Sequence, residues 1–140
     1  MIEKRIIKVI FVVYIIVLFM SLIRFESIGS VKSNDINIIP FSDYSDYPNV
    51  RDIFYNIIGN IIIFIPFGMY LNKLSSKTNT LLKFSVILVS SLIIEASQFF
   101  LKSGHADIDD LIFNSVGGLL GILITGFLDS YISEKSFSRL

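Results

Sequence analysis

Three aspartates and an asparagine form the densest group of side chains in this sequence that can take part in chemistry. Asp107, Asp109 and Asp110 directly precede an apolar stretch that carries Asn114. Carboxylate and amide oxygens are ligands that Mg²⁺ and Ca²⁺ prefer, so the three aspartates are candidate metal ligands, although their spacing differs from that of an EF-hand loop. An aspartate can also cap the start of a helix, but capping accounts for one aspartate and not for three.

Glu95 is the second candidate, because it interrupts an apolar stretch long enough to cross a membrane. A carboxylate at such a depth is costly unless it is paired, protonated or hydrated, which makes it a functional candidate. Together with an aspartate such as Asp110, it can form a catalytic acid/base pair. The chain has no cysteine and a single histidine, which exclude a catalytic thiol, a disulfide framework and a multi-histidine zinc site.

The elements that position these residues follow from the hydropathy of the chain. With 140 residues, 53% of them hydrophobic, and a mean hydropathy of +0.71, the sequence is typical of a single-domain membrane protein. We predict an all-α fold, a bundle of four transmembrane helices at about 6–23, 53–71, 81–101 and 111–128, with outer loops at 24–52 and 102–110. The alternative for the first apolar stretch is a signal peptide within residues 1–29. No basic patch or phosphate-binding loop points to nucleic acid.

The distribution of basic residues predicts how this bundle lies in the membrane. Eight of the twelve Lys and Arg residues fall on the side of the two termini and the 72–80 turn: Lys4, Arg5, Lys8, Lys73, Lys77, Lys83, Lys135 and Arg139. The opposite side carries Arg24, Lys32, Arg51 and Lys102. Because positive charge is enriched on the cytoplasmic side, both termini should be cytoplasmic and the aspartates should face outward.

Polar residues of the last three predicted helices recur at steps of three and four, so each set shares one helix face. At 1.5 Å per residue, Glu95 and Asn60 can lie at one depth below the outer ends of their helices. We therefore predict an outward-facing polar cleft lined by Asn56, Asn60, Glu95, Gln98, Asp107, Asp109, Asp110 and Asn114. The alternative is that the amides are interhelical hydrogen bonds only, and Gly117, Gly118 and Gly121 are predicted to let helices pack closely.

A set of motifs stands in order between residues 37 and 121. The motifs are NIIPF at 37–41, GN at 59–60 followed by FIPFG at 64–68, Glu95 with Gln98, and DIDDLIFN at 107–114 running into GGLLG at 117–121. Together they resemble the VanZ-like family of small bacterial membrane proteins. The resemblance implies a multi-pass protein of Gram-positive cell membranes, in a family whose founding member is associated with resistance to the glycopeptide teicoplanin, and it implies no settled activity. His105 stands where the resemblance leads us to expect an arginine.

Three hypotheses follow for the function. In the first, the cleft binds a polar group of a cell-wall precursor, a lipid headgroup or a surface polymer. In the second, the protein is a membrane enzyme acting on a lipid-linked substrate, with Glu95 as acid/base and the three aspartates holding a divalent cation. In the third, it is a scaffold whose polar groups only pack helices. Membrane lipids are expected partners, and because four short helices enclose little volume, a homodimer is also expected.

Overall fold

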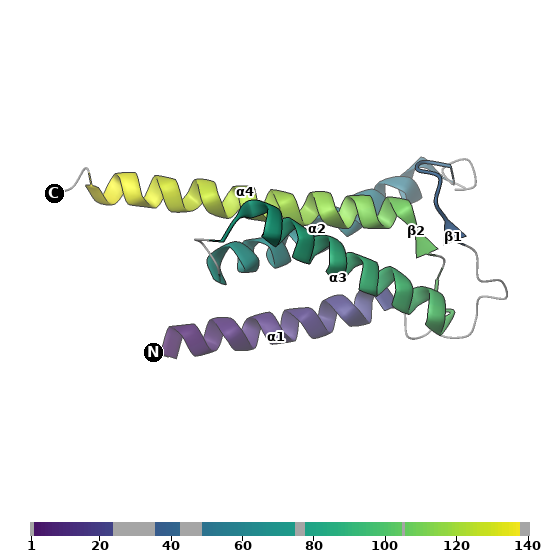
Figure 1. Cartoon of the computed structure of the whole chain (residues 1–140), viewed down its shortest axis with the longest axis horizontal. Helices are drawn as coiled ribbons and strands as arrows, with labels where there is room; N and C mark the ends of the chain where they lie inside the picture. The colour runs from purple at the N-terminus through teal and green to yellow at the C-terminus, as the bar shows by residue number, and fades with distance from the viewer. Residues whose placement is uncertain (1, 24–35, 43–48, 75–77, 105, 138–140) are drawn as a thin grey trace. The chain divides into compact units, whose positions relative to one another are not determined.

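The computed structural model describes residues 2–23, 36–42, 49–74, 78–104 and 106–137 (Figure 1). Within them the chain forms four helices: α1 Ile2–Ile23, α2 Val50–Leu74, α3 Thr80–Leu101 and α4 Ile108–Phe137. Two short strands, β1 Ile36–Asn37 and β2 Ala106–Asp107, lie side by side. The predicted largely helical fold is therefore confirmed.

The helices α2, α3 and the part of α4 from Ile108 to Ile132 are long and apolar enough to cross a membrane. In α1, the apolar part among the residues described is the shorter segment Lys8–Leu18. These lengths support a membrane protein. The fourth span at residues 6–23 and the cytoplasmic position of both termini stay predictions.

The ends of two helices differ from those expected. α2 begins at Val50 instead of residue 53. The Asn49 carbonyl accepts from the Asp52 N–H at 3.0 Å, and Asn49 Nδ2 donates to Asp52 Oδ2 at 3.3 Å, so both groups hold the start of the helix. α4 begins at Ile108 instead of 111, so Asp109 and Asp110 belong to its first turn, where the helix dipole favours acids. It also continues to Phe137, because the polar residues after 128 end the apolar stretch without breaking the helix.

The strand pair is the feature that an all-α prediction missed. β1 and β2 pair in parallel, with Ile36 opposite Ala106 and Asn37 opposite Asp107. The pairing places the start of the NIIPF segment at 37–41 beside the two residues that precede α4. Two-residue strands are too short to show the alternation by which a strand is found in a sequence.

A left-handed residue ends α3 and turns the chain toward β2. Lys102 has φ 50°, its N–H donates to the Phe99 carbonyl at 3.2 Å, and the Ser103 N–H donates to the Gln98 carbonyl at 3.1 Å. These two bonds form a Schellman motif, in which the left-handed position is usually glycine. The turn lets β2 begin only a few residues after the helix ends.

The chain folds as two compact units. The first unit comprises Met1–Ser42 and Leu92–Ile108, and the second comprises Asp43–Ser91 and Asp109–Leu140. α3 passes from the second unit into the first between Ser91 and Leu92. The polar contacts described below fall within one unit or the other.

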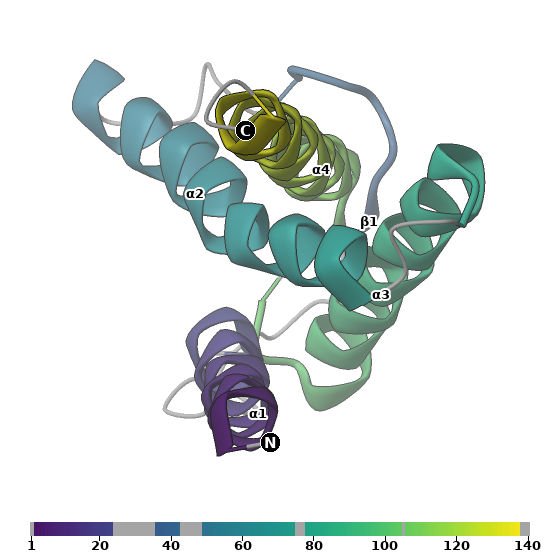
Figure 2. The ribbon, with the colours of Figure 1, turned by 90° about the vertical axis from the view of Figure 1, so that its left-hand side faces the viewer.

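In the second unit, α2 and α4 approach each other backbone to backbone (Figure 2). A methyl group on Gly117 would overlap the carbonyl of Ile61, one on Gly121 that of Ile65, and one on Gly68 that of Gly118. Only glycine permits such an approach, and small residues at helix contacts are common in membranes. The close packing predicted at Gly117 and Gly121 is confirmed, and Gly68 of α2 shares in it.

Candidate functional site

Asn60 and Asp110 join α2 to α4 at the end of the second unit where α4 begins. Asn60 is 8% exposed, and its Nδ2 donates a hydrogen bond to Asp110 Oδ1. Asp110 stands in the first turn of α4, and the carboxylate is therefore fixed between two helices that can span a membrane. The polar residues of α2 and α4 thus contact each other at this pair, and the cleft itself stays a prediction.

Asn114 and Ser91 join α4 to α3 one turn further along. Asn114 is fully buried, and its Nδ2 donates to Ser91 Oγ at 3.0 Å. Its amide oxygen Oδ1 has no hydrogen-bond partner among the residues described. Asp110 and Asn114 are four residues apart and share a helix face. We refer to Asn60, Ser91, Asp110 and Asn114 as the α4 polar face.

A separate cluster forms in the first unit around Asp107. Glu95 is 5% exposed, and its Oε2 accepts a hydrogen bond from the Asp107 N–H at 3.2 Å. Asn37 Nδ2 donates to Asp107 Oδ1 at 3.4 Å, next to the strand pairing. Glu95 thus contacts the backbone of Asp107, and Asn37 contacts the Asp107 side chain. We refer to Asn37, Glu95 and Asp107 as the Asp107 cluster.

Asn37 also shapes the turn that follows β1. Its Oδ1 accepts from the Ile39 N–H and from Ser42 Oγ, both at 3.0 Å. The Ser42 N–H donates to the Ile39 carbonyl at 3.3 Å, and Phe41 adopts φ 62° after Pro40, which is the pattern of a type II turn. Its apolar side chains point outward: Ile38 is 74% exposed and Phe41 57%. The expectation that this turn rests at the membrane interface stays a prediction.

The predicted site residues thus fall into two groups. Asn60, Asp110 and Asn114 lie in the second unit, and Glu95 and Asp107 in the first. Of the others, Asp109 is 2% exposed in the second unit and Gln98 8% exposed in the first, where it lies beside Gly104. Asn56 is half-buried and makes no hydrogen bond to another described side chain. A single cleft that unites all eight residues stays a prediction.

The metal and catalytic assignments also stay predictions. Among the residues described, no three His, Cys, Asp or Glu side chains stand close enough together to hold a metal ion. His105 lies outside the described residues. Asp107 belongs to the first unit, whereas Asp109 and Asp110 belong to the second. Glu95 and Asp110, the candidate acid/base pair, are divided in the same way.

Two residues of the clusters were not among the predicted cleft residues. Ser91 stands four residues before Glu95 on α3, so its place on the polar face of that helix was visible from spacing. Asn37 is the first residue of the NIIPF motif. Its contact with Asp107 joins residues 70 positions apart, and no local pattern signals such a contact.

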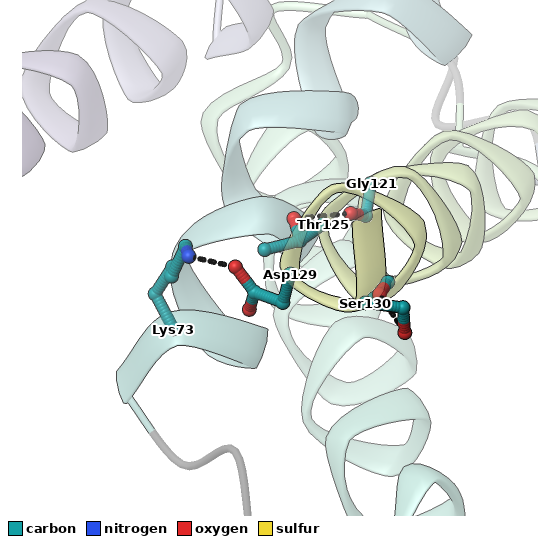
Figure 3. A network of polar contacts seen from close by, with 6 residues as sticks. Lys73, Gly121, Thr125, Asp129 and Ser130 are labelled. Carbon is teal, nitrogen blue, oxygen red and sulfur yellow. Dashed lines mark hydrogen bonds and ion pairs between the residues drawn. The ribbon is translucent and has the colours of Figure 1, made fainter. Parts of the chain in front are cut away.

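The polar groups at the other end of α4 differ in character (Figure 3). Lys73 on α2 and Asp129 on α4 form an ion pair, and their side chains are 60% and 40% exposed. Thr125 Oγ1 donates to the Gly121 carbonyl of its own helix at 2.8 Å, as Ser130 Oγ does to Gly126. Exposed ion pairs contribute little to stability. Asp129 is therefore a control for the carboxylate of the α4 polar face. Thr125, which bonds only its own helix, is a control for its buried polar side chains.

Comparison with known proteins gives two matches. Residues 6–129 match the VanZ/LLP1 family. Over 87 residues the chain is 41% identical to Protein VanZ of Enterococcus faecium, an alignment that covers 62% of this chain and 54% of that protein. The chain thus matches about half the length of this relative. No solved structure matches the chain.

Proposed function

Because the chain belongs to the VanZ/LLP1 family, we propose that it is a multi-pass protein of a Gram-positive cell membrane that binds a polar group of an envelope component. The component is a cell-wall precursor, a lipid headgroup or a surface polymer. The bound group contacts the α4 polar face from the outer side of the membrane. Through this binding, the protein lowers susceptibility to teicoplanin.

The half-buried carboxylate of Asp110, which is hydrogen-bonded between two helices, carries this proposal. A polar side chain in a membrane-spanning helix is costly to insert, and a charged one more so. A scaffold that needs only interhelical hydrogen bonds can use Asn and Ser, as the Asn114–Ser91 pair does. Asp110, held by Asn60 between two such helices, supplies a carboxylate where an interhelical hydrogen bond alone needs only an amide or a hydroxyl. Glu95 adds a carboxylate that is buried, in the first unit.

The surroundings of these groups set the α4 polar face apart from the rest of α4. Beyond Asn114, Gly117 and Gly121 of α4 lie against the backbone of α2, and the next polar contact described between the two helices is the exposed Lys73–Asp129 ion pair. Large apolar side chains such as Phe54 and Phe127 are exposed on the same helices, as expected for surfaces that face lipid. The α4 polar face is thus separated from the exposed ion pair by a closely packed segment of α2 and α4.

Teicoplanin susceptibility tests the proposal with two carboxylates of one helix. Asp110→Asn removes the charge and keeps the shape, and Asp129→Asn does the same at the exposed ion pair. Both variants and the wild-type chain would be expressed in a susceptible Gram-positive host at equal membrane levels. A hydrogen bond to a charged group is worth about 1.5–3 kcal/mol, so Asp110→Asn should weaken binding roughly tenfold or more.

The wild-type chain and Asp129→Asn should then protect the host equally, and Asp110→Asn should not. Glu95→Gln tests the first unit in the same assay. If Asp110→Asn and Glu95→Gln both protect as well as the wild type, the polar side chains are packing groups and the proposal fails.

A further inference from the structure

The amide oxygen of Asn114 is a buried acceptor in the centre of the α4 polar face. Asn114 is fully buried, and its nitrogen is already committed to Ser91. No described residue donates to Oδ1. Nearly all buried polar atoms in native proteins have a partner, and one without a protein partner calls for an explanation such as a bound water or ion. The group that completes Asn114 therefore has to supply a hydrogen-bond donor.

The charge beside Asn114 restricts which donor fits. Asp110 stands one turn earlier on the same face of α4, at a Cβ separation of roughly 5–6 Å for residues four apart. Its carboxylate accepts a hydrogen bond from Asn60 Nδ2 and places a negative charge on this face. A negative charge repels phosphate and carboxylate groups and attracts cations. The surroundings favour a group that is positive and can donate more than one hydrogen bond.

We propose that the α4 polar face binds a primary ammonium group, which donates to Asn114 Oδ1 and to the Asp110 carboxylate. An ammonium has three N–H donors in a tetrahedral arrangement, and with N···O distances of about 2.8 Å it joins oxygens roughly 4.6 Å apart. A hydroxyl has a single donor and no charge. A quaternary ammonium has the charge and no donor. This inference rests on the proposed function and names the chemistry of its ligand.

A primary ammonium occurs both on lipid headgroups and on lysine side chains of peptides, and matched probes separate these sources. Phosphatidylethanolamine and phosphatidylcholine differ in their N–H donors at equal charge. Nα-acetyl-lysine amide and its Nε-trimethyl form differ in the same way without a lipid chain. The purified full-length protein would be titrated with each lipid by native mass spectrometry, and with each lysine derivative by calorimetry in phosphatidylcholine nanodiscs.

We expect at least one primary ammonium probe to bind about tenfold or more tightly than its quaternary counterpart, as the loss of a charge-assisted hydrogen bond implies. A preference confined to phosphatidylethanolamine assigns the group to a lipid, and a preference for the lysine derivative assigns it to a peptide. Equal binding within both pairs would overturn the proposal and leave a trapped water as the partner of Asn114.

Three variants tie the preference to Asn114. Asn114→Leu should abolish it, whereas Asn114→Asp should retain it, because aspartate presents oxygen at both positions of the amide. Thr125→Val is the matched control, since Thr125 is equally buried in α4 and bonds only its own helix. If Asn114→Asp loses the preference, or Asn114→Leu keeps it, the assignment is wrong. If that happens while Asp110→Asn still abolishes teicoplanin protection, the ammonium is not the ligand and the proposed function stands.

Discussion

Replacing single glycines of α2 and α4 by alanine should change the free energy of unfolding by amounts that depend on what the new methyl group meets. At Gly117 the methyl would overlap the backbone carbonyl of Ile61, which cannot rotate away, so α2 must move off α4. Overpacking of this kind costs typically 1–3 kcal/mol. A methyl group on Gly126 would have no heavy atom within 4 Å apart from the neighbouring backbone of its own helix. There, exchanging a helical glycine for alanine should stabilise the protein by roughly 0.5–1 kcal/mol.

The two variants should therefore differ by about 1.5–4 kcal/mol in free energy of unfolding, with opposite signs relative to the wild type. Gly118→Ala should fall between them, because its methyl would meet the side chain of Ile87 instead of a backbone carbonyl. Chemical unfolding in detergent micelles, followed by circular dichroism, measures all three.

The same displacement should reach the functional residues. Ile61 follows Asn60, so moving α2 away from α4 at Gly117 stretches the hydrogen bond between Asn60 and Asp110. Gly117→Ala should for this reason also lose teicoplanin protection at equal membrane levels. If Gly117→Ala and Gly126→Ala unfold at the same denaturant concentration, the backbone contact between α2 and α4 is not as described.

Three further predictions concern the first unit and the acidic residues. Lys102→Gly should raise the free energy of unfolding by about 1 kcal/mol, because a left-handed residue with a side chain is strained where glycine is not; lower stability in the same unfolding assay would contradict the Schellman turn. Asn37→Ala should speed hydrogen–deuterium exchange at the Ile39 amide, which loses its acceptor, and unchanged exchange there would refute that role. If the aspartates of the 107–110 segment hold a divalent cation, EDTA should lower the Tm of protein purified with Mg²⁺, and the Tm should not respond if they do not.

Much of the helical fold could be predicted because long apolar stretches specify membrane helices with little help from the rest of the chain. The stretches at 53–71 and 81–101 lie within α2 and α3. The spacing of polar residues also placed Asn60 and Asp110 on facing sides of two helices, and their hydrogen bond is present. Both predictions use periodicity, which is a local property of the sequence.

The Asp107 cluster could not be predicted in the same way, because it depends on chain reversals and on a contact between distant segments. Lys102 follows α3 in a left-handed conformation, which is usually predicted from a glycine and not from a lysine. Asn37 reaches Asp107 only because the short strands pair. The sequence also presents three aspartates as one group, Asp107, Asp109 and Asp110. In the structure α4 begins between the first and second of them, at Ile108. Asp109 and Asp110 are helical, whereas Asp107 belongs to β2.

Identifying what touches the α4 polar face inside the cell tests the account most directly. A photo-crosslinking amino acid would replace Asn56, which stands one turn before Asn60 on α2, and in a second variant it would replace the exposed Phe127 of α4. Mass spectrometry of the crosslinked protein should show a discrete envelope adduct at position 56 that carries a primary amine and disappears when Asp110→Asn is added. Position 127 should capture bulk lipid only. The same bulk lipid at both positions, unchanged by Asp110→Asn, would contradict a binding site on this face.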